Sequence, residues 1–128
     1  MTDAKLNAIG GVILDAALTV HRELGPGLLE SAYNVSLKHE LQLRNLLVQG
    51  QVPVELNYKG INLGKAYAID LLVENSIIIE IKSTEGINPI HVAQLITYLK
   101  LSERKLGYLI NFNTPLLKNG FKRIVYQF

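Results

Sequence analysis

Residues 68–82 read AIDLLVENSIIIEIK, two apolar runs separated by the turn-like Glu74-Asn75-Ser76. Asp70 lies inside the first run, and Glu80 and Lys82 close the second. A carboxylate within a buried strand is costly unless a partner or a cation compensates for it. Glu80 and Lys82 alternate with Ile81, so they point to the same face of their strand. Neighbouring strands of this kind bring both acids and the amine together, which predicts a site for a hard divalent cation and a polarised water.

Hydrophobic periodicity predicts the elements on either side of this stretch. Helices are predicted at residues 3–24, 28–45 and 89–102, the first ended by Gly25-Pro26-Gly27. Strands are predicted at residues 52–56, 61–63, 68–73, 77–82, 105–112 and 121–128. The order α-α-β-β-β-β-α-β-β places a helix between two apolar strands, as parallel pairing requires. We therefore expect an α/β fold with a central mixed β-sheet flanked by helices.

Patterning also predicts which residues are buried. The strands around Asp70 and Glu80 do not alternate, which is typical of central strands covered on both faces, and Pro53 favours an edge strand. The core-facing residues expected on the second and third helices are Leu28, Ala32, Val35, Leu37 and Leu41, and Ile90, Val92, Leu95, Ile96 and Leu99.

Composition limits the class of protein. The chain has 128 residues, 48% of them hydrophobic, and no cysteine. We expect one domain over residues 1–128 and a cytoplasmic location, because neither a membrane-length apolar stretch nor a secretory signal is visible. Thiolate zinc sites and cysteine nucleophiles are excluded.

The formal charge of +2 is small, but it is unevenly distributed. Six basic residues and one acid lie between Lys100 and Phe128, and the rest of the chain has a net charge of −3. Either the basic half, including Lys100, Lys122 and Arg123, holds a phosphate backbone near a metal, or these are ordinary solvated side chains.

Two further groups have both an ordinary and a functional interpretation. Glu30 is an acid in a helix first turn, where the macrodipole favours it, or it joins Asp70 and Glu80. In the second case Tyr33, on the same face, is expected to contact nucleic acid. Gln94 and Tyr98 share a stripe on the third helix. They are either part of a solvated face or bind phosphate without a net charge.

In combination these segments resemble the PD-(D/E)XK nuclease superfamily. Asp70 and Glu80-Ile81-Lys82 follow a helix with a glutamate and precede Gln94-Leu-Ile-Thr-Tyr98 and Leu109-Ile-Asn-Phe112. Ile69 replaces the proline of the superfamily's name. Gly27-Leu-Leu-Glu30-Ser-Ala-Tyr33 is similar to the motif that names the bacterial GxxExxY proteins.

The resemblance implies a restriction-endonuclease-like core and Mg²⁺, or Mn²⁺ in its place, held by Asp70, Glu80 and the Ile81 carbonyl. Glu30 would add a carboxylate directly or through water. Lys82 would orient or deprotonate the attacking water, and Gln94 and Tyr98 match an additional motif of the exonuclease-like branch.

Three functions follow as alternatives. The leading hypothesis is a metal-dependent nuclease acting on DNA, with a homodimer or a protein partner supplying further contacts. The second is a nucleic-acid-binding or protein-interaction module that keeps the fold without cleaving. The third is a structural domain with a buried ion pair.

Overall fold

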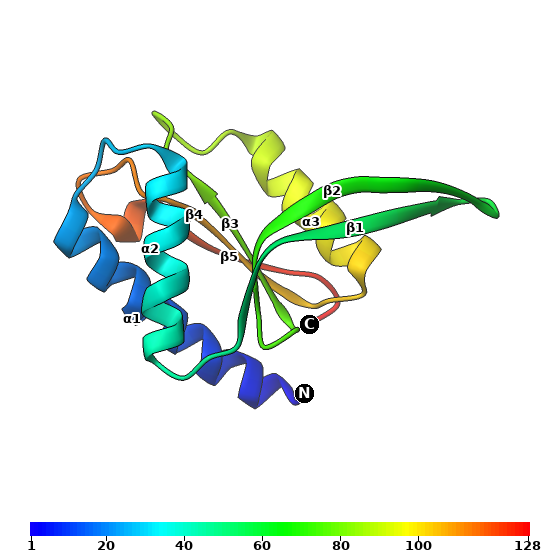
Figure 1. Cartoon of the computed structure of the whole chain (residues 1–128), viewed down its shortest axis with the longest axis horizontal. Helices are drawn as coiled ribbons and strands as arrows, with labels where there is room; N and C mark the ends of the chain where they lie inside the picture. The colour runs from blue at the N-terminus through cyan, green and yellow to red at the C-terminus, as the bar shows by residue number, and fades with distance from the viewer.

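The computed structural model describes residues 1–128 as a five-stranded sheet between two helical layers. The elements are α1 (Asp3–Leu24), α2 (Glu30–Leu43), β1 (Val48–Tyr58), β2 (Ile61–Val73), β3 (Ile77–Lys82), α3 (Pro89–Ser102), β4 (Leu106–Asn111), the short 3₁₀ helix η1 (Leu117–Asn119) and β5 (Phe121–Val125). The strands lie in sequence order. Only β3 and β4 are parallel, and α3 connects them as predicted (Figure 1). The α/β class and the mixed sheet are therefore confirmed.

Local sequence signals explain the helix ends. The Thr2 hydroxyl accepts a hydrogen bond from the Lys5 amide and begins α1, and Gly25, at φ 71°, ends it. Asn88 and His91 form a capping box at the start of α3, where Pro89 occupies the first turn. Both helices have the bounds predicted from the sequence.

Several segments differ from the prediction, among them β1, which is longer than the predicted residues 52–56, and α2, which is shorter than the predicted residues 28–45. Residues 61–63 and 68–73 belong to one continuous strand, β2, which forms a long hairpin with β1. This hairpin projects beyond the rest of the molecule (Figure 1). Pro53 lies on β1, an edge strand, as expected. The last strand ends at Val125 rather than at the C-terminus.

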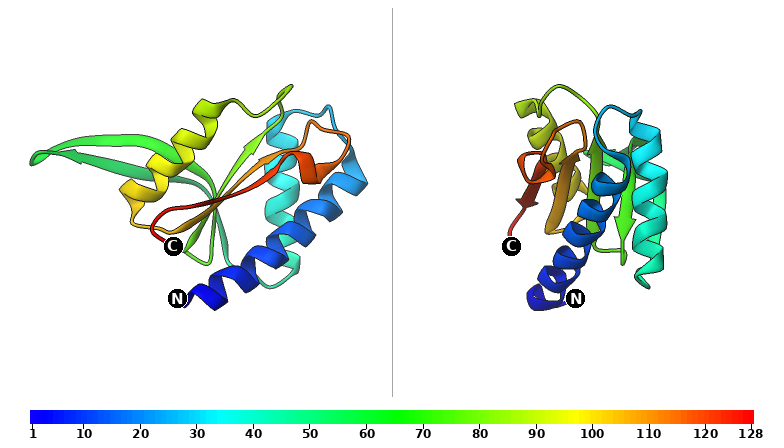
Figure 2. Two further views of the ribbon diagram at one scale, coloured as in Figure 1. Left: turned by 180° about the vertical axis from the view of Figure 1, so that it is seen from behind. Right: turned by 90° about the vertical axis from the view of Figure 1, so that its left-hand side faces the viewer.

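The core has two parts, one on each face of the sheet. The larger part joins α1 and α2 to Leu71, Ile79 and Ile81, and the smaller part joins Leu95 and Leu99 of α3 to Ile78. Figure 2 shows the helices on either side of the sheet. The strands around Asp70 and Glu80 are therefore covered on both faces.

Four residues predicted to face the core are exposed instead. They are Leu28, Val35, Ile90 and Ile96. Leu28 precedes α2, which begins at Glu30, and Val35 lies on the outer side of the helix because Tyr33, Leu37 and Leu41 take the inner side. On α3, Leu95 and Leu99 alone are fully buried.

Candidate active site

The site is created where β2 separates from β3. The ladder between them runs from Val73 and Ile77 to Leu71 and Ile79 and then stops. At the next position the Asp70 carboxylate accepts a hydrogen bond from the Ile81 amide, with an Oδ2–N distance of 2.9 Å. Asp70 is therefore held beside Glu80-Ile81-Lys82 by the backbone of β3.

The hairpin changes face at the same point. Leu71 packs on the α1 and α2 side and Ile69 on the α3 side, although regular alternation would put both on one face. Gln51, which lies between the paired residues Gly50 and Val52, has φ 51°. A non-glycine residue in this region is uncommon. The backbone distortion thus occurs on β1, directly across from Asp70.

Glu80 and Lys82 face the α3 side of the sheet. Glu80 pairs in register with Leu109, which belongs to the α3 side of the core. The Glu80 side chain is only 7% exposed, and its Oε1 atom is buried without any hydrogen-bond partner. Buried polar atoms in proteins are almost always partnered. An orphaned carboxylate oxygen beside a second carboxylate fits a divalent cation, which prefers oxygen ligands.

The electrostatics of Glu80 follow from this placement. Burial, together with the hydrogen bond and negative charge of Asp70, raises the pKa of Glu80 to about 9, although the Lys82 ammonium opposes the shift. Without a cation, Glu80 is therefore protonated at neutral pH. Lys82 is half-buried and close enough for its charge to act on Glu80.

Glu30 is not brought into contact with this pair. It is the first residue of α2 and is exposed. No group of three or more acidic, histidine or cysteine side chains is placed to hold a metal. The Ser83 hydroxyl donates to the Leu28 carbonyl at 2.6 Å, so the start of α2 lies at the end of β3 that carries Lys82. Glu30 is thus on the rim of the site.

Tyr33 is buried and has a structural role, so the prediction that it contacts nucleic acid is wrong. Its side chain is fully buried and stacks on Phe112 at 4.5 Å. Its hydroxyl donates to the Gly25 carbonyl and accepts from the Leu28 amide. Tyr33 therefore holds the Gly25-Pro26-Gly27 loop and, through it, the start of α2, and it cannot touch a substrate.

Tyr98 lies against Tyr67, which sequence reasoning missed. The two rings stack at 3.8 Å, and the Tyr67 hydroxyl donates to the Tyr98 carbonyl. Burial and then the charge of Glu80 raise the pKa of Tyr98, and burial and Tyr98 raise that of Tyr67 to about 12. Both phenols are thus neutral at pH 7, and they lie on the α3 side of the sheet, as Glu80 does. The sequence shows only that Tyr67 is close to Asp70. It does not indicate the stacking, because Tyr98 lies far along the chain.

These observations agree with the comparison of the chain with protein families. The sequence pattern of the PD-(D/E)XK nuclease superfamily matches residues 7–124. The chain belongs to this superfamily. The match covers every strand and helix that positions Asp70, Glu80 and Lys82. No curated protein and no solved structure gave a match.

The basic residues predicted to contact nucleic acid lie on both faces of the sheet. Lys122 pairs with Leu109, which pairs with Glu80, so the three residues form a row across the α3 face. Arg123 points the other way, where it donates to Asn7 of α1 at 2.9 Å. Lys100 and Gln94 are exposed on α3. The sheet therefore places Lys122 on the same face as Glu80 and separates it from Arg123, with which the charge pattern of the sequence groups it.

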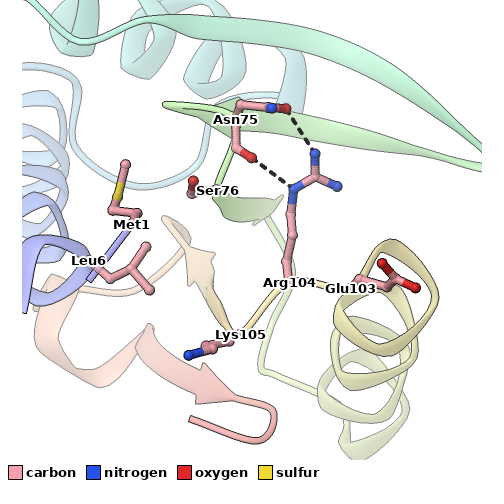
Figure 3. A pocket seen from close by; sticks show the side chains of 7 residues that line it. All are labelled: Met1, Leu6, Asn75, Ser76, Glu103, Arg104 and Lys105. Atoms are coloured by element: carbon pink, nitrogen blue, oxygen red, sulfur yellow. Dashed lines mark hydrogen bonds between the residues drawn. The ribbon is translucent and has the colours of Figure 1, made fainter. Parts of the chain in front are cut away.

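A separate pocket of 170 Å³ lies at the opposite end of β3 (Figure 3). Arg104 spans it and donates to the backbone and side-chain oxygens of Asn75. Glu30, Asp70 and Glu80, the acids predicted for the active site, do not line this pocket. In this member of the superfamily the pocket is therefore distinct from the candidate active site. None of the helices has the length and hydrophobicity needed to cross a membrane.

Proposed function

We propose that the protein is a Mg²⁺-dependent nuclease that hydrolyses phosphodiester bonds in DNA. The proposal depends above all on one observation, the orphaned and buried Glu80 oxygen beside Asp70 and Lys82. A dead site would have little reason to keep this costly arrangement. Membership of the superfamily supports a nuclease activity, and the arrangement of Asp70, Glu80 and Lys82 supports metal-dependent chemistry.

Asp70 and Glu80 would hold the cation, together with the Ile81 carbonyl. When bound, a divalent cation polarises phosphoryl oxygens and lowers the pKa of water. Because Glu80 is protonated at neutral pH, it must lose its proton before it can act as a ligand. Cation binding is therefore expected to release a proton from the site. Mn²⁺ should substitute for Mg²⁺, since both accept carboxylate and carbonyl oxygens.

Lys82 supplies a cationic side chain close to Glu80. From the same face as Glu80, its ammonium can orient the attacking water and offset negative charge that develops on the phosphate. The stacked Tyr67 and Tyr98 rings lie on the α3 side of the sheet, the side that Glu80 also faces. Exposed Gln94, one turn earlier on α3, is free to contact a phosphate.

We further propose that the protein belongs to the GxxExxY group within the superfamily and acts in the bacterial cytoplasm. The supporting feature is Gly27-Leu28-Leu29-Glu30-Ser31-Ala32-Tyr33. Two residues of this motif have conformations or contacts that explain their residue type. Gly27 has φ 96°, and Tyr33 anchors the loop that precedes Glu30. The chain has little surface beyond the core to grip a duplex, so a second copy or a protein partner would complete the interface.

The test is cleavage of labelled single- and double-stranded DNA and RNA with Mg²⁺ or Mn²⁺. Lys82→Ala should lower the rate by about 10²–10³, the usual loss for one preorganised electrostatic group. Lys118→Ala, which removes an exposed lysine elsewhere, is the matched control. Equal cleavage by Lys82→Ala and wild type would assign the activity to a contaminant. A wild type that binds Mn²⁺ and DNA but cuts nothing would establish a non-cleaving binding module instead.

A further inference from the structure

A second polar pocket lies between α2 and β1, the strand that pairs with the Asp70 strand β2. Its volume is 340 Å³, and it is lined by Ser31, Asn34, Val35, Lys38, Gly50 and Gln51. The four α2 residues lie on one stripe of the helix. Gly50 and Gln51 come from the part of β1 that faces Leu71 and Asp70 across the hairpin.

The lining favours an anion. It contains one ammonium, two amides and a hydroxyl, and no carboxylate. Lys38 forms neither an ion pair nor a hydrogen bond with the rest of the protein, although it is half-buried. A cation in such a position retains all of its donors for a ligand. Phosphate oxygens are the natural partners of this set of donors.

The pocket adjoins Asp70 through the backbone. A Cβ placed on Gly50 would lie 3.5 Å from the Lys38 ammonium and 3.8 Å from the Asp70 carbonyl oxygen. These distances correspond to ordinary van der Waals contact, so the Lys38 ammonium lies against β1 close to the backbone of Asp70. Gln51, with its φ of 51°, comes next in the chain and lines the same pocket.

The start of α2 adds to the positive potential. Leu29 precedes the helix and provides no side-chain cap, so the first amides of α2 lack that partner. Ser31, in this first turn, lines the pocket, whereas Glu30 does not. The helix dipole and Lys38 therefore act in the same direction.

We infer that this pocket binds a backbone phosphate of the nucleic-acid substrate, on the α2 side of the β1–β2 hairpin that carries Asp70, with Lys38 as its charged contact. The inference builds on the proposed nuclease function. It adds a path for the strand over β1 toward Asp70. Because the donors recognise phosphate and not base edges, this contact is independent of sequence.

The test measures binding of a fluorescent oligonucleotide, single-stranded and as a duplex, in EDTA at several salt concentrations. Lys38→Ala should reduce the slope of log affinity against log salt by about 0.9 for duplex or 0.7 for single strands. Near 0.1 M salt this corresponds to binding weakened about eightfold for duplex or about fivefold for single strands. Lys38→Arg should keep the wild-type slope. Lys5→Ala, which removes a lysine on α1, is the control for loss of charge alone.

Binding in EDTA separates this inference from the proposed function. A reduced slope in Lys38→Ala but not in Lys5→Ala supports the pocket, whether or not cleavage is detected. An unchanged slope in Lys38→Ala overturns it even if the wild type cuts DNA with Mg²⁺. Equal losses in the two variants would also overturn it, because the effect would then be one of net charge.

Discussion

Glu80 shows what a sequence can and cannot reveal about a single side chain. Its spacing from Asp70 and Lys82 predicted that these groups would lie together, and the structure places Asp70 on the Ile81 amide and Glu80 beside it. The burial of Glu80 and the loss of a partner for Oε1 depend on where β2 separates from β3. The point of separation depends on the folded sheet, so the local sequence pattern does not predict it.

The raised pKa of Glu80 predicts that the metal-free protein loses stability as pH rises. Its pKa of about 9 in the folded state lies above the ordinary value of 4.5, so between these values the folded state binds more protons than the unfolded state. The stabilising contribution is complete below the lower value and is lost as pH rises through the higher one. The free energy of unfolding in EDTA should fall by about 1.4 kcal/mol per pH unit at the steepest point.

Chemical denaturation of the wild type and of Glu80→Gln across this pH range checks the prediction. The variant should show a flatter profile, because a neutral amide replaces the titrating group. Glu85→Gln, at an exposed position, should behave like the wild type. Parallel profiles for wild type and Glu80→Gln would contradict the assignment.

A second prediction concerns cation binding by Asp70 and Glu80. Mg²⁺ or Mn²⁺ should raise the melting temperature, because a ligand that binds only the folded state stabilises it by about 2.7 kcal/mol at one hundred times its Kd. Asp70→Asn should abolish the rise, and so should Glu80→Gln. Thermal melting with a titration of each cation provides the measurement, and Glu85→Gln should retain the full response. Metal-independent melting of the wild type would exclude a cation site at this pair.

Helix α1 contacts the sheet closely at Gly10, and the sequence alone did not predict this contact. Gly10 and Gly11 occur in the middle of the helical pattern without any sign of which one is required. A Cβ at Gly10 would overlap the Tyr108 hydroxyl on β4, whereas a Cβ at Gly11 meets nothing within 4 Å. Gly10 therefore permits the close approach of α1 to β4, and Gly11 does not contribute to it.

This difference predicts opposite effects for two neighbouring substitutions. Gly11→Ala should stabilise the protein by about 0.5–1 kcal/mol, since alanine favours a helix interior. Gly10→Ala should destabilise it by about 1–3 kcal/mol, because the added methyl group overpacks the contact. Urea denaturation gives both values. Adding Tyr108→Phe, which removes the overlapping oxygen, should recover much of the loss, and a double-mutant cycle without coupling would refute the proposed overlap.

The elements themselves were predictable to different degrees. The bounds of α1 and α3 followed from caps and from Gly25 and Pro89, which act locally. Val35 and Ile90 were predicted to be buried but are exposed, since apolarity alone does not say which side of a helix meets the sheet. The stacking of Tyr67 on Tyr98 required the tertiary fold, because it joins β2 to α3.

Across the whole molecule, the sheet divides the charges between two faces. The larger core lies against α1 and α2, and the other face, under α3, carries Glu80 and Lys82. The sequence predicted a basic C-terminal half but could not assign its residues to a face. Neighbours on one strand point in opposite directions, so register was needed to separate Lys122 from Arg123.

This separation makes the two adjacent residues a matched pair for a test of substrate binding. Lys122 on β5 and Glu80 on β3 lie on the same face of the sheet. Only β4 lies between these two strands, so the strands are about 10 Å apart. Arg123 is engaged with Asn7 and stacks over the Phe128 ring on the far side. If nucleic acid lies across the α3 face, Lys122→Ala should reduce the salt slope of binding by about 0.9 for duplex or 0.7 for single strands, and Arg123→Ala should leave it unchanged. Anisotropy measured at several salt concentrations distinguishes the two variants, which have the same net charge. The reverse outcome, a loss confined to Arg123→Ala, would contradict the prediction that nucleic acid lies across the α3 face beside Lys122 and Glu80.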